Sequence, residues 1–315
     1  MEKRSCFTPG LPWRDTSGNR IQAHGGCVLE HEGTYYWYGE NKDGETQGAK
    51  DNSLLHRVDV IGMSCYSSPD LYNWSYEGLA LPAEPDDPAH DLHPSKVAER
   101  PKVLYNRRTG QFVMWLHVDT SDYTYARIGI AVSDTPTGPF RYLHSISPNG
   151  LDSRDMTLFQ DEDSSAYVIY SARWNSCVVV SRLSADYLSV TDECIELFQK
   201  EGVSSSREAP AVFRWKGKYY MLTSGCTGWA YNEAELACAD DMMGQWTVLG
   251  NPCRGQGAGT TFEAQSAFVF RSGERYIAMF DRWQPDNLRN SSYVWLPFDF
   301  TGASPALFWK DSWSL

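Results

Sequence analysis

One pattern returns five times along the 315-residue chain and constrains its fold more than any other feature. Each copy is an apolar run, a short turn with Gly or polar residues, and a second run rich in aromatic side chains. Two β-prone runs joined by such a turn predict an antiparallel β-hairpin. The five copies are GGCVLEHEGTYYWYGE from Gly25, ERPKVLYNRRTGQFVMWLHV from Glu99, SRDMTLFQDEDSSAYVIYSA from Ser153, REAPAVFRWKGKYYMLTSGC from Arg207 and FEAQSAFVFRSGERYIAMFD from Phe262.

Further β-prone runs follow several of these hairpins. The segments 61–78, 129–143 and 236–250 each combine a run of small residues, a polar turn and an aromatic residue that opens another strand. Three or four antiparallel strands per unit, repeated five times at intervals of about 50–75 residues, are typical of propeller blades. We therefore expect an all-β fold, a single five-bladed β-propeller over residues 1–315. A β-sandwich is the alternative, but sandwiches do not repeat one hairpin signature at this period.

Charge and composition exclude several classes of partner. The formal net charge is −12 without a stripe of Lys and Arg, so nucleic acids and anionic membranes are poor candidates. No run approaches the roughly 18–20 apolar residues that span a bilayer. MEKRSCFTPGLPW has no apolar run behind its basic residues, so we expect a cytoplasmic protein if Met1 is native, and otherwise a secreted one whose signal peptide was removed. The eight cysteines form no CxxC pair and are expected to be reduced.

A polar residue stands just before the first apolar run of each unit. These residues are His24, Glu99, Asp155, Glu208 and Gln265. The innermost strand of every propeller blade lines the central channel, so equivalent positions converge on one end of the axis. We expect the five side chains to form a ring around a pocket. Three of them are carboxylates, and their mutual repulsion and desolvation cost stability, which indicates a functional use.

Clustered carboxylates suit the hydrolysis of a glycosidic bond. One acid must protonate the departing oxygen, while a second group activates water or attacks the anomeric carbon. The first acid needs a raised pKa, which neighbouring negative charge can supply. The alternative is that Glu99, Asp155 and Glu208 form ion pairs with the arginines beside them in the sequence. Adjacent residues of a strand point to opposite faces, so those arginines are poor partners.

Aromatic side chains could supply the rest of a sugar-binding site. They make up 14% of the chain, and the apolar faces of sugars stack on such rings. Trp229 and Trp283 are the strongest candidates, because their Gly and polar neighbours indicate the ends of strands. The other candidates are the aromatic residues Trp115, Tyr123, Tyr125 and Trp174 and, for sugar hydroxyls, Asn175, Asp119 and Thr227.

In these residues the sequence resembles the five-bladed propeller enzymes of glycoside hydrolase family 43. The resemblance runs from AHGG at Ala23 to the terminal WKDSW and is strongest to the exo-β-1,3-galactanase group. The stretches that carry it are AHGGCVLEHEGTYYWYGE, ERPKVLYNRRTGQFVMWLH, SRDMTLFQDED, REAPAVFRWKGKYYMLTSGCTGW, GNPC and TTFEAQSAFV. It implies an inverting hydrolase in which Glu208 is the general acid. It also implies that Asp155 raises the pKa of that acid and orients it, and that Glu99 binds sugar.

The chain departs from most of that family at the start of the first blade. Where most members carry an aspartate base, this sequence has His24. The galactanase group also lacks the aspartate, and Gln265 matches a glutamine proposed there to take its place by positioning water. A neutral amide is a poor base, so Glu263 or Glu40 could serve if either reaches the pocket. The sequence shows no appended carbohydrate-binding module, which favours short oligosaccharides over polymer.

The resemblance implies an exo-acting β-1,3-galactosidase whose partner is an oligosaccharide from β-1,3-galactan or arabinogalactan. One alternative is an α-L-arabinofuranosidase, β-xylosidase or β-galactofuranosidase on the same fold, because a fold does not set a substrate. Another is a non-catalytic sugar-binding propeller. We expect no cofactor and no metal requirement. His24 is a conceivable metal contact, but a lone histidine is far more often structural or in contact with substrate. The sequence leaves the oligomeric state open.

Overall fold

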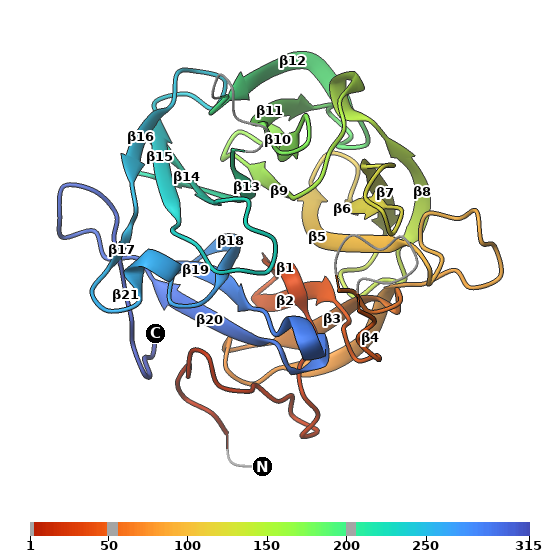
Figure 1. The fold of residues 1–315 in the computed structure, drawn as a ribbon, viewed down its shortest axis with the longest axis horizontal. Helices are drawn as coiled ribbons and strands as arrows, with labels where there is room; N and C mark the ends of the chain where they lie inside the picture. The colour runs from red at the N-terminus through yellow and green to blue at the C-terminus, as the bar shows by residue number, and fades with distance from the viewer. Residues whose placement is uncertain (1–2, 49–55, 200–205) are drawn as a thin grey trace.

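Five antiparallel sheets surround one axis in the computed structural model, which describes residues 3–48, 56–199 and 206–315. Figure 1 looks along this axis and shows the sheets as the blades of a propeller. The predicted all-β, five-bladed propeller is therefore confirmed. Each blade is an up-and-down sheet, because strands that are consecutive in the sequence pair directly with each other.

The first three blades have four strands each. Blade 1 contains β1 (His24–His31), β2 (Thr34–Glu40), β3 (Gly62–Ser68) and β4 (Ser75–Pro82). Blade 2 contains β5 (Val97–Asn106), β6 (Gln111–Asp119), β7 (Arg127–Ser133) and β8 (Arg141–Ile146). Blade 3 contains β9 (Met156–Gln160), β10 (Ala166–Ala172), β11 (Cys177–Leu183) and β12 (Val190–Leu197).

The last two blades complete the ring. Blade 4 contains β13 (Glu208–Trp215), β14 (Lys218–Ser224), β15 (Glu235–Ala239) and β16 (Thr247–Gly250). Blade 5 contains β18 (Gln265–Ser272), β19 (Arg275–Arg282) and β20 (Ser292–Pro297), and β17 (Cys253–Arg254) pairs in parallel with β21 (Leu307–Phe308) beside it. Three short 3₁₀ helices, η1 (Pro148–Gly150), η2 (Ala258–Thr260) and η3 (Pro285–Asn290), lie between strands.

The first strand of each blade lies nearest the axis. These five strands, β1, β5, β9, β13 and β18, contact one another in order around the ring (Figure 1). Their side chains alternate between the two faces of each blade, and the apolar ones pack between neighbouring blades. The strands start at the same end of the axis, so the polar residues at their beginnings gather there.

The two ends of the described chain meet where blade 5 closes against blade 1. The backbone N–H of Phe7 donates to the Trp313 carbonyl at 2.8 Å, and the two rings stack with centroids 4.4 Å apart. Behind them Trp37 of β2 and Trp295 of β20 are fully buried, with ring centroids 4.7 Å apart. Buried aromatic pairs of this kind are worth about 0.5–1.5 kcal/mol beyond their burial. The aromatic cluster thus joins the first and last blades without an exchanged strand.

All eight cysteines are free thiols, as expected. Four of them are buried, including Cys27 and Cys177 inside strands. In the part of the chain that the structure describes, no helix has the length and apolar character needed to cross a bilayer. The connection from blade 1 to blade 2 covers residues 83–96, since β4 ends at Pro82 and β5 begins at Val97.

Candidate active site

The same backbone irregularity follows the leading polar residue in three of the blades. His24, Glu99 and Glu208 lie in the first strands of blades 1, 2 and 4, and the strand register shifts just after each of them. The residues that follow, Gly25, Arg100 and Ala209, all have left-handed backbones with φ of 59°, 53° and 52°. Such bulges re-aim a side chain at the end of a strand. In blade 1 only glycine fits, because a Cβ on Gly25 would lie 2.3 Å from Glu40 Oε1.

The polar ends of the inner strands surround a cavity of about 340 Å³, here called the axial cavity. This volume lies within the range of about 300–1,000 Å³ of small-ligand pockets. Nine of the fourteen residues proposed from the sequence for the polar ring and the sugar contacts line it: Glu99, Tyr123, Asp155, Trp174, Asn175, Glu208, Trp229, Gln265 and Trp283. Glu40, Lys42, Arg100, His117, Arg154, Cys226 and Gly228 complete the wall.

Five of the proposed residues do not line this cavity: His24, Tyr125, Thr227, Trp115 and Asp119. Trp115 is fully buried and donates to the Tyr187 carbonyl, and Asp119 is buried beside His117. His24 is fully buried, with Nδ1 2.9 Å from Asp281 Oδ1 and its ring 5.3 Å from that of Trp283, so it supports the wall from behind. Tyr125 is exposed, and its hydroxyl bonds Ser145. The Thr227 hydroxyl is used inside its own loop, where it donates to the Ala230 carbonyl. The expected substrate contact by His24 is therefore wrong, because its ring has no exposed surface.

Glu208 and Asp155 lie next to each other at the cavity wall. The backbone N–H of Ala209 donates to Asp155 Oδ2 at 3.0 Å, which holds the Asp155 carboxylate beside the Glu208 backbone. Burial of the Glu208 carboxyl and, second, the nearby Asp155 carboxylate raise the pKa of Glu208 to about 8. A carboxyl with this pKa keeps its proton at neutral pH and can act as a general acid.

Arg100 ties the site together and was missed by the sequence reasoning. Its Nε lies 2.7 Å from Asp155 Oδ1, and its two terminal nitrogens donate to the Ser266 carbonyl at 2.9 Å and to Gln265 Oε1 at 2.7 Å. The prediction that Arg100 does not pair with its neighbour Glu99 agrees with these contacts. The partner is instead a carboxylate of the next blade. Nothing in the sequence around Arg100 indicated that it would pair with a residue of another blade.

The amide of Gln265 connects Arg100 to the acid. Because an arginine can only donate, the atom that faces it must be Oε1, so the amide nitrogen points to Glu208. Nε2 donates to Glu208 Oε1 at 2.9 Å and to the Ser224 hydroxyl at 3.2 Å. Oε1 also accepts from Trp283 Nε1 at 3.2 Å. All hydrogen-bonding positions of this amide are therefore used inside the protein.

Glu99 is held as an anion on another side of the cavity. The Tyr123 hydroxyl donates to Glu99 Oε1 at 3.0 Å, and His117 Nδ1 lies 3.4 Å from Oε2. Burial alone would raise the pKa of Glu99, but His117, Lys42 and Tyr123 outweigh it and lower the pKa to about 2. His117 also pairs with Asp119, 3.0 Å away, and these two carboxylates raise its pKa to about 9 against the effect of burial. Glu99 is thus a strong hydrogen-bond acceptor and a weak base.

Of the two carboxylates considered as alternative bases, only Glu40 reaches the cavity. Glu40 is buried, its Oε1 accepts the Arg100 N–H at 2.9 Å, and its Oε2 lies 2.7 Å from Lys42 Nζ. Glu263 is exposed and lines a separate surface groove.

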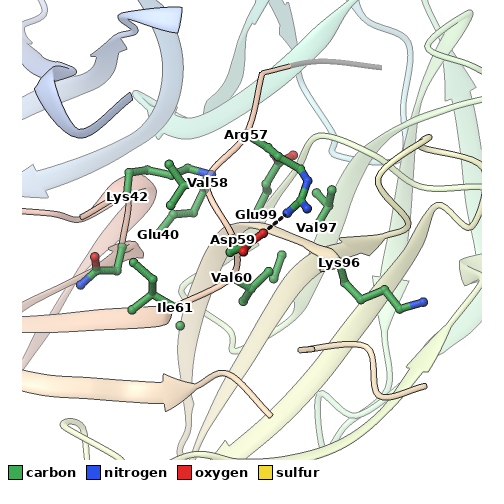
Figure 2. Close-up of a pocket in the computed structure, with 13 residues that line it drawn as sticks. Glu40, Lys42, Arg57, Val58, Asp59, Val60, Ile61, Lys96, Val97 and Glu99 are labelled. Carbon is green, nitrogen blue, oxygen red and sulfur yellow. Dashed lines mark ion pairs between the residues drawn. The ribbon is translucent and has the colours of Figure 1, made fainter. Parts of the chain in front are cut away.

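A second cavity of about 10 Å³, large enough for about one water, adjoins the Glu40–Lys42 pair (Figure 2). It shares Glu40, Lys42 and Glu99 with the axial cavity. Its other walls come from Asn41 and from residues 57–62 and 96–98, where Arg57 and Asp59 form an ion pair of 2.8 Å.

Tryptophan rings and unsatisfied polar atoms complete the axial cavity. The rings of Trp229 and Trp283 meet edge to face with centroids 5.6 Å apart. Within the described residues, Trp229 Nε1 and Asn175 Oδ1 are buried and have no hydrogen-bond partner in the protein. Buried polar groups are normally bonded, so these two atoms fit a ligand that brings hydroxyl groups.

Cys226 follows β14 and lines the axial cavity. Burial and the adjacent Glu208 raise the pKa of its thiol to about 12, so the thiol stays protonated. Over residues 3–48, 56–199 and 206–315, no group of three or more His, Cys, Asp and Glu side chains is arranged to hold a metal ion.

The chain is similar in sequence and in fold to proteins of known structure. The family model for glycosyl hydrolases family 43 matches residues 24–254. A GH43 β-1,3-galactosidase, solved with galactodeoxynojirimycin, is 38% identical with a TM-score of 0.89, over 98% of this chain and 100% of that one. A second GH43 β-1,3-galactosidase is 36% identical with a TM-score of 0.90, over 100% of this chain and 64% of that one. The exo-β-1,3-galactanase of Phanerochaete chrysosporium, solved with galactose, is 35% identical with a TM-score of 0.86, over 98% of this chain and 68% of that one. No curated protein sequence matches the chain.

Proposed function

The chain belongs to the glycosyl hydrolases of family 43, and from that membership we propose that it releases galactose from the non-reducing end of β-1,3-linked galactan or arabinogalactan-derived oligosaccharides. The observation that carries the proposal is the pair formed by Glu208 and Asp155 at an open cavity, with the pKa of Glu208 raised to about 8. The galactose and galactodeoxynojirimycin bound to similar enzymes support galactose as the sugar.

Glu208 is the general acid in this proposal. Its carboxyl proton passes to the glycosidic oxygen while the bond from that oxygen to the anomeric carbon breaks, and the electron pair leaves with the departing sugar. Asp155 keeps the carboxyl protonated until this step, because a second negative charge beside it is unfavourable. Arg100 holds Asp155 in place through its 2.7 Å ion pair.

Gln265 positions the attacking water. The water forms its bond to the anomeric carbon from the face opposite the acid and releases a proton to solvent, which inverts the configuration. An inverting pair needs a separation of roughly 6.5–9.5 Å, whereas Gln265 Nε2 now lies 2.9 Å from Glu208. The sugar must therefore enter between them and break this hydrogen bond. Gln265 Oε1 then accepts from water in place of the longer bond from Trp283.

Glu99 and Asn175 orient the sugar. The anionic Glu99 accepts hydroxyl protons, and Asn175 Oδ1 and Trp229 Nε1 offer an unused acceptor and donor. Both atoms are buried and unbonded. A sugar hydroxyl that bonds to one of them therefore adds more binding free energy than a hydroxyl that bonds to an exposed group.

A substrate panel tests this proposal. Purified enzyme is given β-1,3-galactobiose, an aryl α-L-arabinofuranoside, an aryl β-xyloside and an aryl β-galactofuranoside, with Glu208→Gln as the control that should lose its activity on galactobiose. We expect galactose release from β-1,3-galactobiose with a kcat/KM well above the other three. If the enzyme cleaved only the arabinofuranoside, the xyloside or the galactofuranoside, the assignment of β-1,3-galactan as the substrate would be wrong. Binding of galactobiose without turnover of any compound would indicate a sugar-binding propeller.

A further inference from the structure

Trp174 is an exposed aromatic side chain at the cavity that none of the proposed steps uses. It is 56% exposed, whereas Trp283 in the same wall is 8% exposed. A large apolar ring open to water at a binding cavity is available to a ligand.

The turn that carries Trp174 is strained, and one carboxylate accepts two of its backbone N–H groups. Arg173, Trp174 and Asn175 are three successive residues with left-handed backbones, with φ of 53°, 54° and 59°. Bulky residues rarely adopt this conformation, and it persists where the surroundings enforce it. Asp152 supplies the restraint, because Oδ1 accepts the N–H of Arg173 at 2.6 Å and Oδ2 accepts the N–H of Trp174 at 2.9 Å.

A second contact sets the orientation of the indole. The guanidinium carbon of Arg154 lies 4.0 Å from the centre of the Trp174 ring, a close cation–π contact. Arg154 is itself paired with Asp152 and donates to the Tyr123 carbonyl at 3.1 Å. The arginine thus covers one face of the indole, and the opposite face is left for a ligand.

The neighbour of Trp174 shows which part of a ligand meets the ring. Asn175 Nδ2 donates to Glu208 Oε2 at 3.1 Å, so the turn lies against the acid. A general acid faces the oxygen of the departing group. The sugar that leaves is therefore on the side of Trp174. This inference rests on the proposed function for the identity of that sugar.

We propose that Trp174 is the stacking platform for the departing galactose unit, and that Asp152 is a positioning residue that holds the platform through the strained turn. Trp174 binds the second sugar of the substrate and makes no contact with the galactose that is released from the non-reducing end.

Calorimetric titration with galactose and with β-1,3-galactobiose tests the platform. Glu208→Gln is compared with the double variants Glu208→Gln/Trp174→Ala and Glu208→Gln/Trp174→Phe. We expect Trp174→Ala to weaken the binding of galactobiose by about tenfold, which corresponds to about 1.4 kcal/mol, and to leave the binding of galactose unchanged. Trp174→Phe should retain most of the affinity. Equal losses for both sugars, or no loss for either, would overturn the assignment. A wild type that binds galactobiose in this way without cleaving it would overturn the proposed function alone.

A cycle of variants in the active enzyme tests Asp152. On β-1,3-galactobiose we expect Asp152→Asn and Trp174→Ala each to lower kcat/KM by about tenfold, and the double variant to lose no more than Trp174→Ala. Both variants should hydrolyse β-galactosyl fluoride, which has no departing sugar, at the wild-type rate. Losses that multiply in the double variant, or an equal loss on the fluoride, would show that Asp152 acts elsewhere or only on folding.

Discussion

The guanidinium of Arg100 lies 2.7 Å from Asp155, Nε to Oδ1, and joins blade 2 to the carboxylate that precedes blade 3. The same guanidinium donates to Gln265 of blade 5. One buried cation therefore holds two of the three groups assigned to the reaction. It also balances the Asp155 charge, which would otherwise stand unpaired beside Glu208.

Removing this cation should damage the reaction and change its pH dependence. We expect Arg100→Met to lower kcat/KM on β-1,3-galactobiose by at least about tenfold, because Asp155 and Gln265 lose their support. Arg100 lowers the pKa of Glu208. Without it, the alkaline limb of the pH profile, where kcat/KM falls as the pH rises, should lie at a higher pH than in the wild type. Arg271→Met, on the exposed outer end of β18, is the matched control and should behave as wild type. An unchanged alkaline limb in a folded Arg100→Met protein would contradict the account.

The alkaline limb of the wild type reports the proton of Glu208. Because the acid works only when protonated and its pKa is raised to about 8, kcat/KM should fall as the pH rises through about 8. Asp155→Asn removes the second cause of that shift, so its limb should move to lower pH. The check is a pH profile of kcat/KM for both proteins. A wild-type limb near pH 5, the range of an ordinary glutamate, would contradict the assigned environment.

The same shift makes Glu208 costly for stability at neutral pH. The pKa of the folded-state carboxyl, about 8, lies above the ordinary value of 4.5, so the folded protein binds the proton more tightly. Stability from this group is present below pH 4.5 and is lost as the pH rises towards 8. Glu208→Gln should therefore have a higher Tm than wild type at pH 8 and a similar Tm near pH 4. Thermal unfolding of both proteins at the two pH values measures this. A Tm difference between them that is the same at pH 4 and pH 8 would contradict the prediction.

Azide tests the role given to Gln265. In Gln265→Ala no side-chain amide positions the attacking water, so the hydrolysis of an activated aryl β-galactoside should slow. Added azide should restore turnover. Azide attacks from the face opposite the departing group, so the product should be α-galactosyl azide. Glu40→Ala, which removes the other candidate at the cavity, should not be rescued because Glu40 is already bonded to Arg100 and Lys42. Rescue in Glu40→Ala instead would move the water-activating role to Glu40.

The fold was predictable because its signals are local. Alternation of apolar residues and glycine turns such as Gly33 and Gly217, with φ of 77° and 80°, define each hairpin within a few residues. Five copies of one hairpin then leave few architectures. The placement of Glu208, Asp155, Glu99 and Gln265 followed from the same repeat, since equivalent strand starts meet at one end of the axis.

The remaining contacts depend on packing between blades. Arg100 and Ala209 adopt left-handed backbones without being glycine, and no sequence pattern marks such residues. His24 stands at the equivalent position of blade 1, yet Asp281 and Tyr293 of blade 5 hold its ring behind the wall. Trp174 enters the cavity through a turn whose anchor, Asp152, lies 22 residues earlier. These relationships join distant segments and become visible only in three dimensions.

The most direct test of the account compares Glu208→Gln with wild type on two substrates. β-1,3-Galactobiose has a poor leaving group that needs the acid's proton, whereas a dinitrophenyl β-galactoside does not. The account predicts a loss of kcat/KM of about 10²–10⁴ on galactobiose and a much smaller loss on the aryl galactoside. Equal losses on both substrates, or unchanged cleavage of galactobiose, would contradict it.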